Sequence, residues 1–377
     1  MDREKQAIVV GFDAKRIVSN TTGLGNYGRT LVNDLASDPA LQLRLYAPDG
    51  GREPLRQQVV SQPNVTFCYP SKSWLPFYRQ YWRSHWVVAS LVADHVDVYH
   101  GLSGELPIGI SRSGIKSVVT IHDLIFLRHP EYYHWLDTKI YAWKFRRTIQ
   151  EADRIIAISE CTKRDIMEFG GVSADKIDVI YQSCNPVFAQ PLSESALAKV
   201  RHQYGLSSRF ILNVGTIERR KNLLLAIRAL DHLPQNIHLV AVGRRTDYVK
   251  EFPQNPRVHL LSGVTDETLK ALYQLAEAFV YPSRYEGFGI PIIEAIHSGL
   301  PVVACTGSCL EEAGGPDSLY VAPDDVEGMA HAVSLSLKGA EGREERIRRS
   351  REYVRRFEGA DVASQVKDVY RVMSYEL

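Results

Sequence analysis

Two glutamates, Glu286 and Glu294, lie on either side of the most chemically informative stretch of this chain. Between them runs Gly-Phe-Gly-Ile-Pro, in which Pro291 suits the first turn of a helix. Gly287 and Gly289 leave room for a ligand to approach the backbone. A helix N-terminus offers unpaired N–H groups to a phosphate, and carboxylates accept hydrogen bonds from hydroxyl groups. The stretch therefore predicts a site for a ligand that carries both, such as a nucleotide sugar.

A second motif, Gly-Thr-Ile-Glu-Arg-Arg-Lys-Asn, occupies residues 215–222 directly after an apolar run. Arg220 and Lys221 stand where a helix is expected to begin, with Asn222 as its cap. Two cations are unfavourable at that end of the helix dipole, so we expect them to meet an anion. A diphosphate fits, because arginine donates forked hydrogen bonds and lysine supplies a point charge. The alternative is a solvated basic turn.

Two further motifs lie in the first half of the chain. Gly23, Leu24 and Gly25 precede a predicted helix and would let the backbone approach a phosphate or a sugar, the alternative being a simple glycine turn. The excursion over residues 15–22 rules out the tight turn of a dinucleotide-binding fingerprint. His122 ends an apolar strand and can change charge near neutral pH, although a purely structural histidine remains the alternative. Asp123 is expected either to orient that ring or to cap the next turn.

The elements that position these motifs alternate between short apolar runs and amphipathic segments, which predicts an α/β protein with parallel sheets. Strands are expected at 8–14, 41–47, 65–69, 97–100, 117–121, 154–158, 176–181, 210–215, 237–243, 258–261, 278–281 and 301–304. Helices are expected near 25–36, 78–93, 135–152, 160–169, 222–233, 266–276, 291–298 and 325–337. Prolines near residues 183–195 interrupt the pattern and predict a linker between two doubly wound domains.

Composition is that of an ordinary globular protein, with 377 residues, 45% hydrophobic and 24% charged. A net charge of +1 gives no support for nucleic-acid binding. The five scattered cysteines predict buried free thiols in a reducing compartment. Neither a signal peptide nor a membrane-spanning run is evident, so the expected location is the cytoplasm.

These motifs, in this order, resemble retaining glycosyltransferases of family four, which have the GT-B fold of two Rossmann-like domains facing each other across a cleft. The stretch Ile-Ser-Glu-Cys-Thr-Lys at 158–163 is similar as well. The resemblance implies an N-terminal acceptor-side domain over residues 1–185, a nucleotide-sugar domain over 186–357, and a C-terminal helix over 358–377 that returns to the first domain. It covers nearly the whole chain.

The resemblance also implies roles for individual residues. Glu294 would bind the ribose hydroxyls, Glu286 would face the donor sugar, and Arg220 with Lys221 would hold the diphosphate. His122 would lie beside the sugar. The remaining donor contacts would come from Gly23, Leu24, Gly25, Asp123, Thr216, Val264, Phe288, Gly289 and Ile290.

Some relatives carry arginine where this chain has Thr216. The Gly-Thr variant, together with His-Asp-Leu, is similar to bacterial mannosyltransferases of surface-polysaccharide assembly, so GDP-mannose is the expected donor. The expected reaction keeps the anomeric configuration, with the departing phosphate accepting the proton of the acceptor hydroxyl. A covalent intermediate on Glu286 is the rival. Neither a metal nor another cofactor is expected, because Asp324 and Asp325 read better as a helix cap.

The acceptor is expected to be a glycan or a lipid-linked glycan, with Glu105 as a candidate contact. Residues 74–86 concentrate aromatic and basic side chains, which could form a weak peripheral contact with the inner face of a membrane. The alternative is that Tyr78, Trp82 and Trp86, spaced by four residues, pack together into the first domain.

Two other functions compete with glycosyl transfer. One is a nucleotide-sugar 2-epimerase, an isomerase of the same architecture. It would need basic residues for elimination of the nucleotide, and none is evident beyond His122. The other is a binding module that retains the nucleotide pocket without catalysis. Intact Glu286, Glu294, Lys221 and His122 argue against the second.

Overall fold

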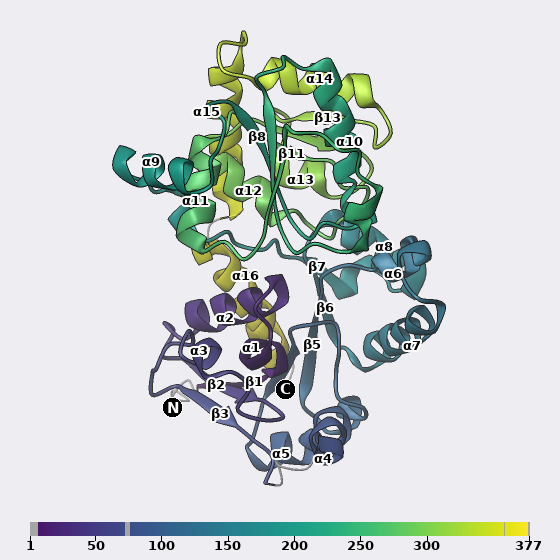
Figure 1. Ribbon diagram of the computed structural model, residues 1–377. Coiled ribbons are helices and arrows are strands. Elements are labelled where there is room, and N and C mark those ends of the chain that lie inside the picture. The colour runs from purple at the N-terminus through teal and green to yellow at the C-terminus, as the bar shows by residue number, and fades with distance from the viewer. Residues whose placement is uncertain (1–6, 72–75, 358, 376–377) are drawn as a thin grey trace. The chain divides into compact units, whose positions relative to one another are not determined.

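The computed structural model describes residues 7–71, 76–357 and 359–375. The chain divides into two compact units. Unit 1 combines Met1–Ser183 with Gly359–Leu377, and unit 2 is Cys184–Glu358. Each unit is a twisted parallel sheet with helices on both faces (Figure 1). The expected α/β class with two doubly wound sheets is confirmed.

The sheet of unit 1 has the strand order β3-β2-β1-β4-β5-β6-β7, and all neighbours are parallel. Its strands are β1 (Ile8–Asp13), β2 (Leu41–Tyr46), β3 (Val65–Cys68), β4 (Val98–Gly101), β5 (Lys116–Ile121), β6 (Arg154–Ala157) and β7 (Ile177–Val179). Because the chain first builds outward from β1 and then returns to place β4 on its other side, the connections diverge between β1 and β4. Ligands of such sheets bind at the carboxyl ends of the strands at this point.

Helices cover both faces of this sheet. The α-helices of unit 1 are α1 (Lys15–Ser19), α2 (Gly23–Leu35), α3 (Glu53–Arg56), α4 (Pro76–Tyr81), α5 (Val87–Ala93), α6 (Ile125–Arg128), α7 (Trp135–Glu151), α8 (Glu160–Gly170) and α16 (Gly359–Tyr375). A π-helix, η1 (Trp82–Trp86), joins α4 to α5, and short 3₁₀ turns are η2 (Ile110–Arg112), η3 (Pro130–Tyr132) and η4 (Ala174–Lys176).

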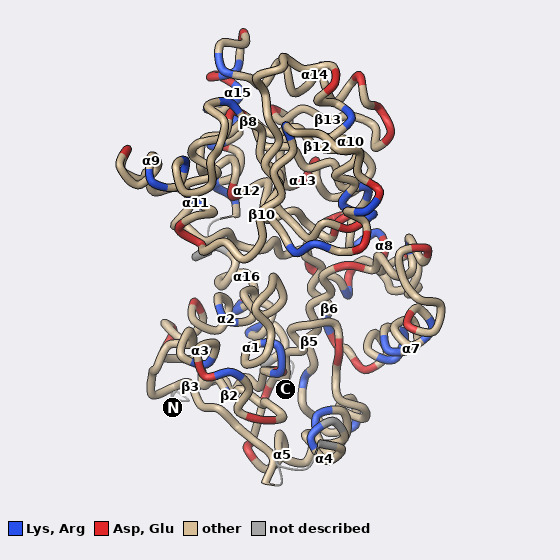
Figure 2. The backbone as a smooth tube through the Cα atoms, viewed as in Figure 1, with Lys and Arg blue, Asp and Glu red and all other residues tan. Residues whose placement is uncertain are grey.

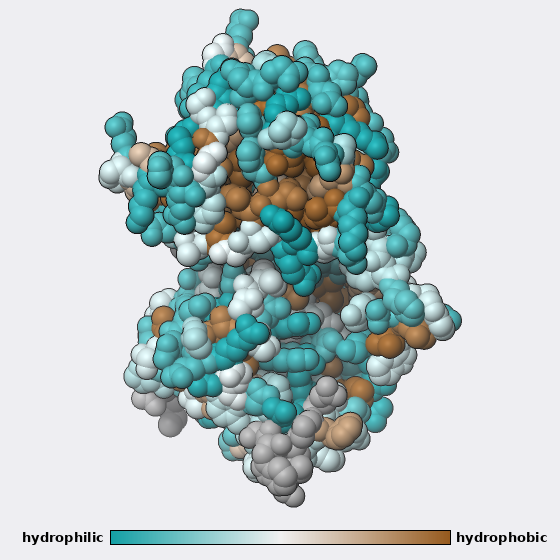
Figure 3. Space-filling model, in the orientation of Figure 1, coloured by the Kyte–Doolittle hydropathy of each residue, from teal (hydrophilic) through white to brown (hydrophobic). Residues whose placement is uncertain are grey.

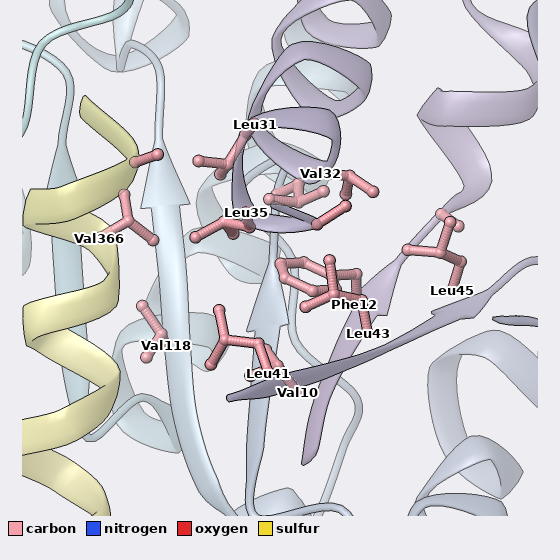
Figure 4. Packing of buried hydrophobic residues seen from close by; sticks show 14 of the residues in the cluster. Val10, Phe12, Leu31, Val32, Leu35, Leu41, Leu43, Leu45, Val118 and Val366 are labelled. Atoms are coloured by element: carbon pink, nitrogen blue, oxygen red, sulfur yellow. The ribbon is translucent and has the colours of Figure 1, made fainter. Parts of the chain in front are cut away.

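One face of the sheet packs against α1, α2 and α16 (Figure 4). Phe12 and Val118 of the strands, Leu35 of α2 and Val366 of α16 are all buried in this cluster. The C-terminal tail therefore packs in unit 1, although unit 2 precedes it in the chain. The opposite face, with Tyr99 among its buried residues, is covered by α5, α7 and α8.

The sheet of unit 2 has the order β10-β9-β8-β11-β12-β13, again all parallel. Its strands are β8 (Phe210–Val214), β9 (His238–Val242), β10 (Val258–Leu261), β11 (Ala278–Tyr281), β12 (Val302–Cys305) and β13 (Leu319–Val321). The equivalent switch point lies between β8 and β11. The sequence analysis did not predict β13, a strand of three residues.

The α-helices of unit 2 are α9 (Glu194–Gln203), α10 (Leu223–Ala229), α11 (Asp266–Leu275), α12 (Ile290–His297), α13 (Leu310–Gly314), α14 (Val326–Ser336) and α15 (Arg343–Val354). Its 3₁₀ turns are η5 (Pro186–Ala189), η6 (Arg219–Lys221), η7 (Leu230–His232), η8 (Asp247–Glu251) and η9 (Arg355–Phe357). On one face α10 and α14 pack with Val280 of β11, while Phe279 points the other way and meets Tyr273 of α11.

All five cysteines are free thiols, as expected, and all but the half-buried Cys68 are buried. Across the described part of the chain, no helix is both long and apolar enough to cross a membrane.

Candidate active site

The two motifs of the second half of the chain meet at the switch point of unit 2. Residues 215–222 follow β8, and residues 283–289 follow β11, its direct neighbour in the sheet. The backbone N–H of Arg284 donates to the carbonyl oxygen of Arg220 at 2.9 Å, which ties the two loops together. The site is therefore built at the place where doubly wound sheets bind ligands.

Three charged side chains form the centre of this site. Glu286 forms ion pairs with both cations, its Oε1 lying 2.5 Å from Nζ of Lys221 and its Oε2 lying 2.9 Å from Nη1 of Arg220. Lys221 also donates to the hydroxyl of Tyr281 at 2.7 Å, and Arg220 donates to the carbonyl oxygen of Tyr285 at 2.7 Å. Both cations, from the loop after β8, are therefore held by partners on β11 and on the loop that follows it. The alternative of a solvated basic turn is wrong for Arg220 and Lys221.

Burial and charge oppose each other at Glu286, whose residue is only 8% exposed. Burial alone would raise the pKa of its carboxyl, but Lys221 and Arg220 lower that pKa to about 2. In return, attraction to Glu286 outweighs burial and raises the pKa of Lys221 and of Arg220. All three groups are therefore charged at neutral pH.

Glu294 has a different environment, although it lies on the helix that the same loop begins. Its Oε2 accepts a hydrogen bond of 2.8 Å from the hydroxyl of Tyr273 on α11. Burial raises the pKa of this carboxyl to about 7, and the Tyr273 hydrogen bond opposes the rise. Glu286 and Glu294 therefore differ in charge state near neutral pH, a distinction that their spacing in the sequence does not reveal.

The loop that carries Glu286 is held from beneath by a residue that the sequence analysis did not select. The thiol of Cys309 donates to the carbonyl oxygen of Glu286 at 3.1 Å and to that of Phe288 at 2.8 Å. Gly289 follows with φ of 121°, a conformation that favours glycine, and a Cβ there would lie 3.2 Å from Leu310. Ile290 then begins α12, with Pro291 in its first turn as predicted.

The remaining predicted donor contacts of unit 2 lie at strand ends. Thr216 follows β8, and Val264 follows β10. The expected capping by Asn222 is wrong: it occupies the N-cap position of α10 with φ of 54°, but its amide donates to the carbonyl oxygen of Pro323 instead. Gly243, which was not predicted, has no room for a Cβ because the carbonyl oxygen of Gly215 would lie 1.8 Å away.

In unit 1, His122 directly follows β5, but its ring is committed to internal hydrogen bonds. Nε2 lies 2.8 Å from the carbonyl oxygen of Leu102, and Nδ1 lies 2.7 Å from the amide nitrogen of Gln182. A carbonyl only accepts, so Nε2 carries the proton and Nδ1 accepts from Gln182. Burial lowers the pKa of His122 to about 4, and the ring is neutral at physiological pH. This arrangement suits positioning better than proton transfer.

The two glycines of the unit 1 motif differ in the space around them. A Cβ on Gly25 would lie 2.0 Å from the carbonyl oxygen of Asn20, so this glycine is required by packing of the α1–α2 turn. A Cβ on Gly23 would meet nothing within 4 Å, and Leu24 is half-buried. Gly23 is thus the member with space for a ligand. Asp123 accepts from the backbone N–H of Ile125 at 3.2 Å, which supports the capping alternative.

Glu105 follows β4 and is held by two cations. Its carboxylate pairs with Arg83 at 2.6 Å and with Lys144 at 2.9 Å. Burial would raise the pKa of Glu105, but Arg83 and Lys144 lower it to about 2. Its first role is to position these cations.

The aromatic segment departs from the expected common face. Trp82 is buried, whereas Trp86 is 49% exposed, because the turn between them is a π-helix and residues four apart no longer superimpose. Tyr78 contacts the ring of Trp86 at 5.3 Å between centroids. Trp74 lies outside the described residues.

Two doubly wound parallel sheets in one chain are the architecture of the GT-B fold. The structure of Anabaena HepE in complex with UDP and glucose superimposes with a TM-score of 0.73 over 97% of this chain and 100% of that chain, at 18% identity. This likeness supports the fold.

Sequence comparison assigns the family. Residues 198–353 match the family described as Glycosyl transferases group 1, and residues 21–186 match Glycosyltransferase Family 4. The chain is 30% identical to O-antigen chain mannosyltransferase B of Escherichia coli, over 74% of this chain and 76% of the relative. It is 27% identical to O-antigen chain mannosyltransferase RfbU of Salmonella typhimurium, over 81% and 83%. The chain belongs to the family-four, group-one glycosyltransferases, which confirms the family that the motifs resemble.

Proposed function

We propose that this glycosyltransferase moves a hexose, mannose in the first instance, from a nucleotide diphosphate sugar to a glycan or lipid-linked glycan in the assembly of a surface polysaccharide. The observation that carries the proposal is the cluster of Arg220, Lys221 and Glu286 at the β8–β11 switch point. Its chemistry fits a diphosphate leaving group next to a hydroxyl-rich sugar. The names of the two O-antigen mannosyltransferases support mannose and the polysaccharide context.

The electrostatics of the cluster suggest how its residues divide the work. Departure of the nucleoside diphosphate places negative charge on phosphate oxygens, and Arg220 with Lys221 would stabilise that charge. Glu286, whose pKa is about 2, stays ionised and would accept hydrogen bonds from sugar hydroxyls rather than donate a proton. The departing phosphate would take the proton of the acceptor hydroxyl, and the product would keep the anomeric configuration. Glu294 would bind the ribose.

The donor is tested by thermal unfolding in the presence of GDP-mannose, GDP, UDP-glucose and UDP. A ligand that binds only the folded state raises the unfolding temperature, and at a fixed ligand concentration the rise is larger for tighter binding. We expect the largest rise with GDP and GDP-mannose. An equal or larger rise with the UDP compounds would contradict guanine as the base of the donor nucleotide. No rise with any of the four compounds would overturn the nucleotide site.

Product analysis tests the reaction. Incubation with donor and acceptor should yield a new glycoside whose anomeric configuration, read by NMR, matches that of the donor. Incubation without acceptor separates transfer from the epimerase alternative, since an epimerised nucleotide sugar would favour the isomerase. Membership of a glycosyltransferase family supports transfer.

The proposed reaction needs no divalent metal. In unit 2, Asp324 pairs with Arg284, and Asp325 caps α14 by accepting from the backbone N–H of Gly328 at 2.8 Å. Both aspartates are thereby assigned to structure. We expect transfer to survive treatment with a chelator. Loss of transfer that manganese restores would contradict this.

Peripheral contact with a membrane is part of the same proposal, because a lipid-linked acceptor would be presented there. Phe77 is 90% exposed, and Trp135 and Trp143 of α7 are more than half exposed. Figure 3 shows scattered hydrophobic residues on the otherwise mostly hydrophilic surface of unit 1. Exposed aromatic side chains favour the interface of a bilayer. The intact chain should float with anionic vesicles, and the fraction that floats should fall in Phe77→Ser. The control is Val372→Ser, which changes an exposed apolar residue of α16 and should leave that fraction unchanged. Absence of flotation would refute the membrane contact.

A further inference from the structure

A pocket of about 600 Å³ lies in unit 1 between the start of α1, the π-helix η1 and α7. Its lining contributes five cations, Lys15, Arg79, Arg83, Lys144 and Arg147. Within this lining the carboxylates are Asp49 and Glu105. The five cations belong to α1, α4, η1 and α7, and Figure 2 shows blue lysine and arginine segments in this part of unit 1. The side chains that face the pocket are therefore predominantly positive.

Buried carboxylates behind the pocket hold two of these cations in place. Arg83 lies between Asp13, at 2.6 Å, and Glu105, at 2.6 Å. Arg147 pairs with Glu151 at 3.3 Å, and Glu151 also accepts the backbone N–H groups of Gly109 and Ser111. Asp13 and Glu151 are nearly inaccessible to solvent, so these carboxylates orient the arginines and do not face the pocket. Such fixed guanidinium groups are typical of sites that bind a planar or multiply charged anion.

Two nitrogen atoms of the lining have donor capacity to spare. Among the described residues, the ammonium group of Lys15 has no hydrogen bond or ion pair, and Nε of Arg147 is buried without a hydrogen-bond partner. Burial, and secondly the charge of Arg83, lower the pKa of Lys15. The cations thus repel one another, and an anion would relieve that repulsion.

The polar pocket adjoins an apolar groove. The groove is lined by Phe77, Tyr78, Tyr81 and Trp86, and Ser84 lines both cavities. A ligand with a charged group and an apolar chain could therefore occupy the two together. This juxtaposition distinguishes the pocket from the proposed diphosphate site of unit 2, where Arg220 and Lys221 both pair with Glu286.

We propose that the pocket lined by Lys15, Lys144 and Arg147 binds a phosphate or diphosphate group of the acceptor. This inference rests on the proposed function and adds to it that the acceptor is a phosphoester. Two sources share this chemistry, a lipid diphosphate whose chain follows the aromatic groove and a soluble sugar phosphate. A diphosphate offers several acceptor oxygens to the spare donors of Lys15 and Arg147, whereas a single carboxylate offers only two.

Calorimetric titration of the intact protein with farnesyl diphosphate, and separately with inorganic pyrophosphate, tests the pocket. The diagnostic variant is Arg147→Gln, and its matched control is Arg146→Gln, the same change at an exposed neighbour on α7. Glu151 keeps its bonds to Gly109 and Ser111 in the first variant, so the fold should survive. Lys221→Met reports on binding at the donor site instead.

We expect Arg147→Gln to weaken binding of both probes in the pocket by about tenfold, as loss of a charge-assisted hydrogen bond does, whereas Arg146→Gln should stay within about twofold. Lys221→Met should remove only a separate binding event at the donor site and leave the pocket event within about twofold. Loss of binding in Lys221→Met alone, or failure of either probe to bind, would overturn the inference. Absence of sugar transfer with probe binding intact would instead count against the proposed function.

A further comparison identifies the source of the phosphoester. Phe77→Ser should weaken farnesyl diphosphate but not pyrophosphate if the acceptor is lipid-linked. Equal affinity for the two probes, unaffected by Phe77→Ser, would retain the pocket and assign it to a soluble phosphorylated acceptor.

Discussion

The charge of Glu286 is maintained by two cations that approach from a neighbouring loop, and this contact makes the three residues interdependent. Removing one member of a buried ion pair leaves the other charge without compensation, which costs more than the pair itself contributes. Substitutions at this site therefore change stability as well as catalysis, and the two effects must be measured together.

Lys221→Met tests this coupling. We expect transfer to fall at least about a hundredfold, because a charge that stabilises the leaving group is lost. The free energy of unfolding should fall by about 3 kcal/mol, because Glu286 keeps only Arg220 as a partner. Steady-state kinetics and denaturant unfolding measure the two effects.

Arg219→Gln serves as the control for that experiment. Arg219 belongs to the same basic motif, but its side chain is 69% exposed and pairs with Glu251. We expect near-normal transfer and stability. Equal damage from both substitutions would contradict the assignment of the diphosphate to the buried cations.

Glu294 gives a prediction of how stability depends on pH. Burial raises the pKa of its carboxyl to about 7, whereas in the unfolded chain the value is about 4.3. The stabilisation linked to this proton is complete below the unfolded value and is lost as pH rises through the folded value. Relative to Glu294→Gln, the wild-type free energy of unfolding should fall by on the order of 2 kcal/mol between about pH 5 and pH 8.

Urea unfolding of both proteins across this pH range measures the difference. Parallel curves would mean that Glu294 titrates at an ordinary pKa and is ionised before any nucleotide arrives.

At the scale of the elements, the strands were predicted well, because a buried parallel strand is a short apolar run and needs no distant information. β13 was missed because Leu319–Val321 is too short to stand out. The π-helix Trp82–Trp86 was missed because four-residue spacing indicates a regular α-helix. Both failures concern local geometry that is decided by packing.

The candidate site shows the same limit. The residue types of Arg220, Lys221 and Glu286 were recognisable, but the direct contact between loops more than sixty residues apart was not. Likewise, nothing near His122 in the sequence indicates that Gln182 occupies Nδ1. Sequence spacing identifies which groups are present, whereas the fold determines which of them are still free to act.

The two glycines at the start of α2 provide a prediction at this scale. Gly25→Ala would place Cβ 2.0 Å from the carbonyl oxygen of Asn20, so we expect a loss of about 2 kcal/mol in the stability of unit 1. Gly23→Ala meets no atom within 4 Å and should change stability by less than about 0.5 kcal/mol. Thermal unfolding compares the two.

The activity of Gly23→Ala then reports on ligand approach. Reduced transfer at unchanged stability would support contact between this backbone and the donor. Normal transfer would reduce Gly23 to a turn residue.

At the scale of the whole molecule, the chain passes between the units twice, near residues 183 and 358. The tail over residues 359–377 thus belongs to unit 1, where Val362, Val366, Tyr370 and Met373 are buried. Tyr370 also bonds through its hydroxyl to Nδ1 of His100 at 2.5 Å, in the interior of the unit.

A chain that ends at Glu358 tests this dependence. Four large buried side chains contribute on the order of 8 kcal/mol, which is comparable to the whole stability of a domain. We expect unit 1 to unfold and unit 2 to remain folded. Limited proteolysis followed by mass spectrometry should then recover a resistant fragment near residues 184–358. Protection of both units would show that α16 is dispensable.

The interleaved arrangement also dictates an order of events on the ribosome. Unit 2 is continuous over residues 184–358 and can fold as soon as it emerges, whereas the core of unit 1 waits for a helix encoded after it. At a synthesis rate of roughly 5–20 residues per second, the 175 intervening residues take roughly 10–35 seconds. During that interval the apolar surface that α16 later covers is open to chaperones, so the domain begun first is the last to be completed.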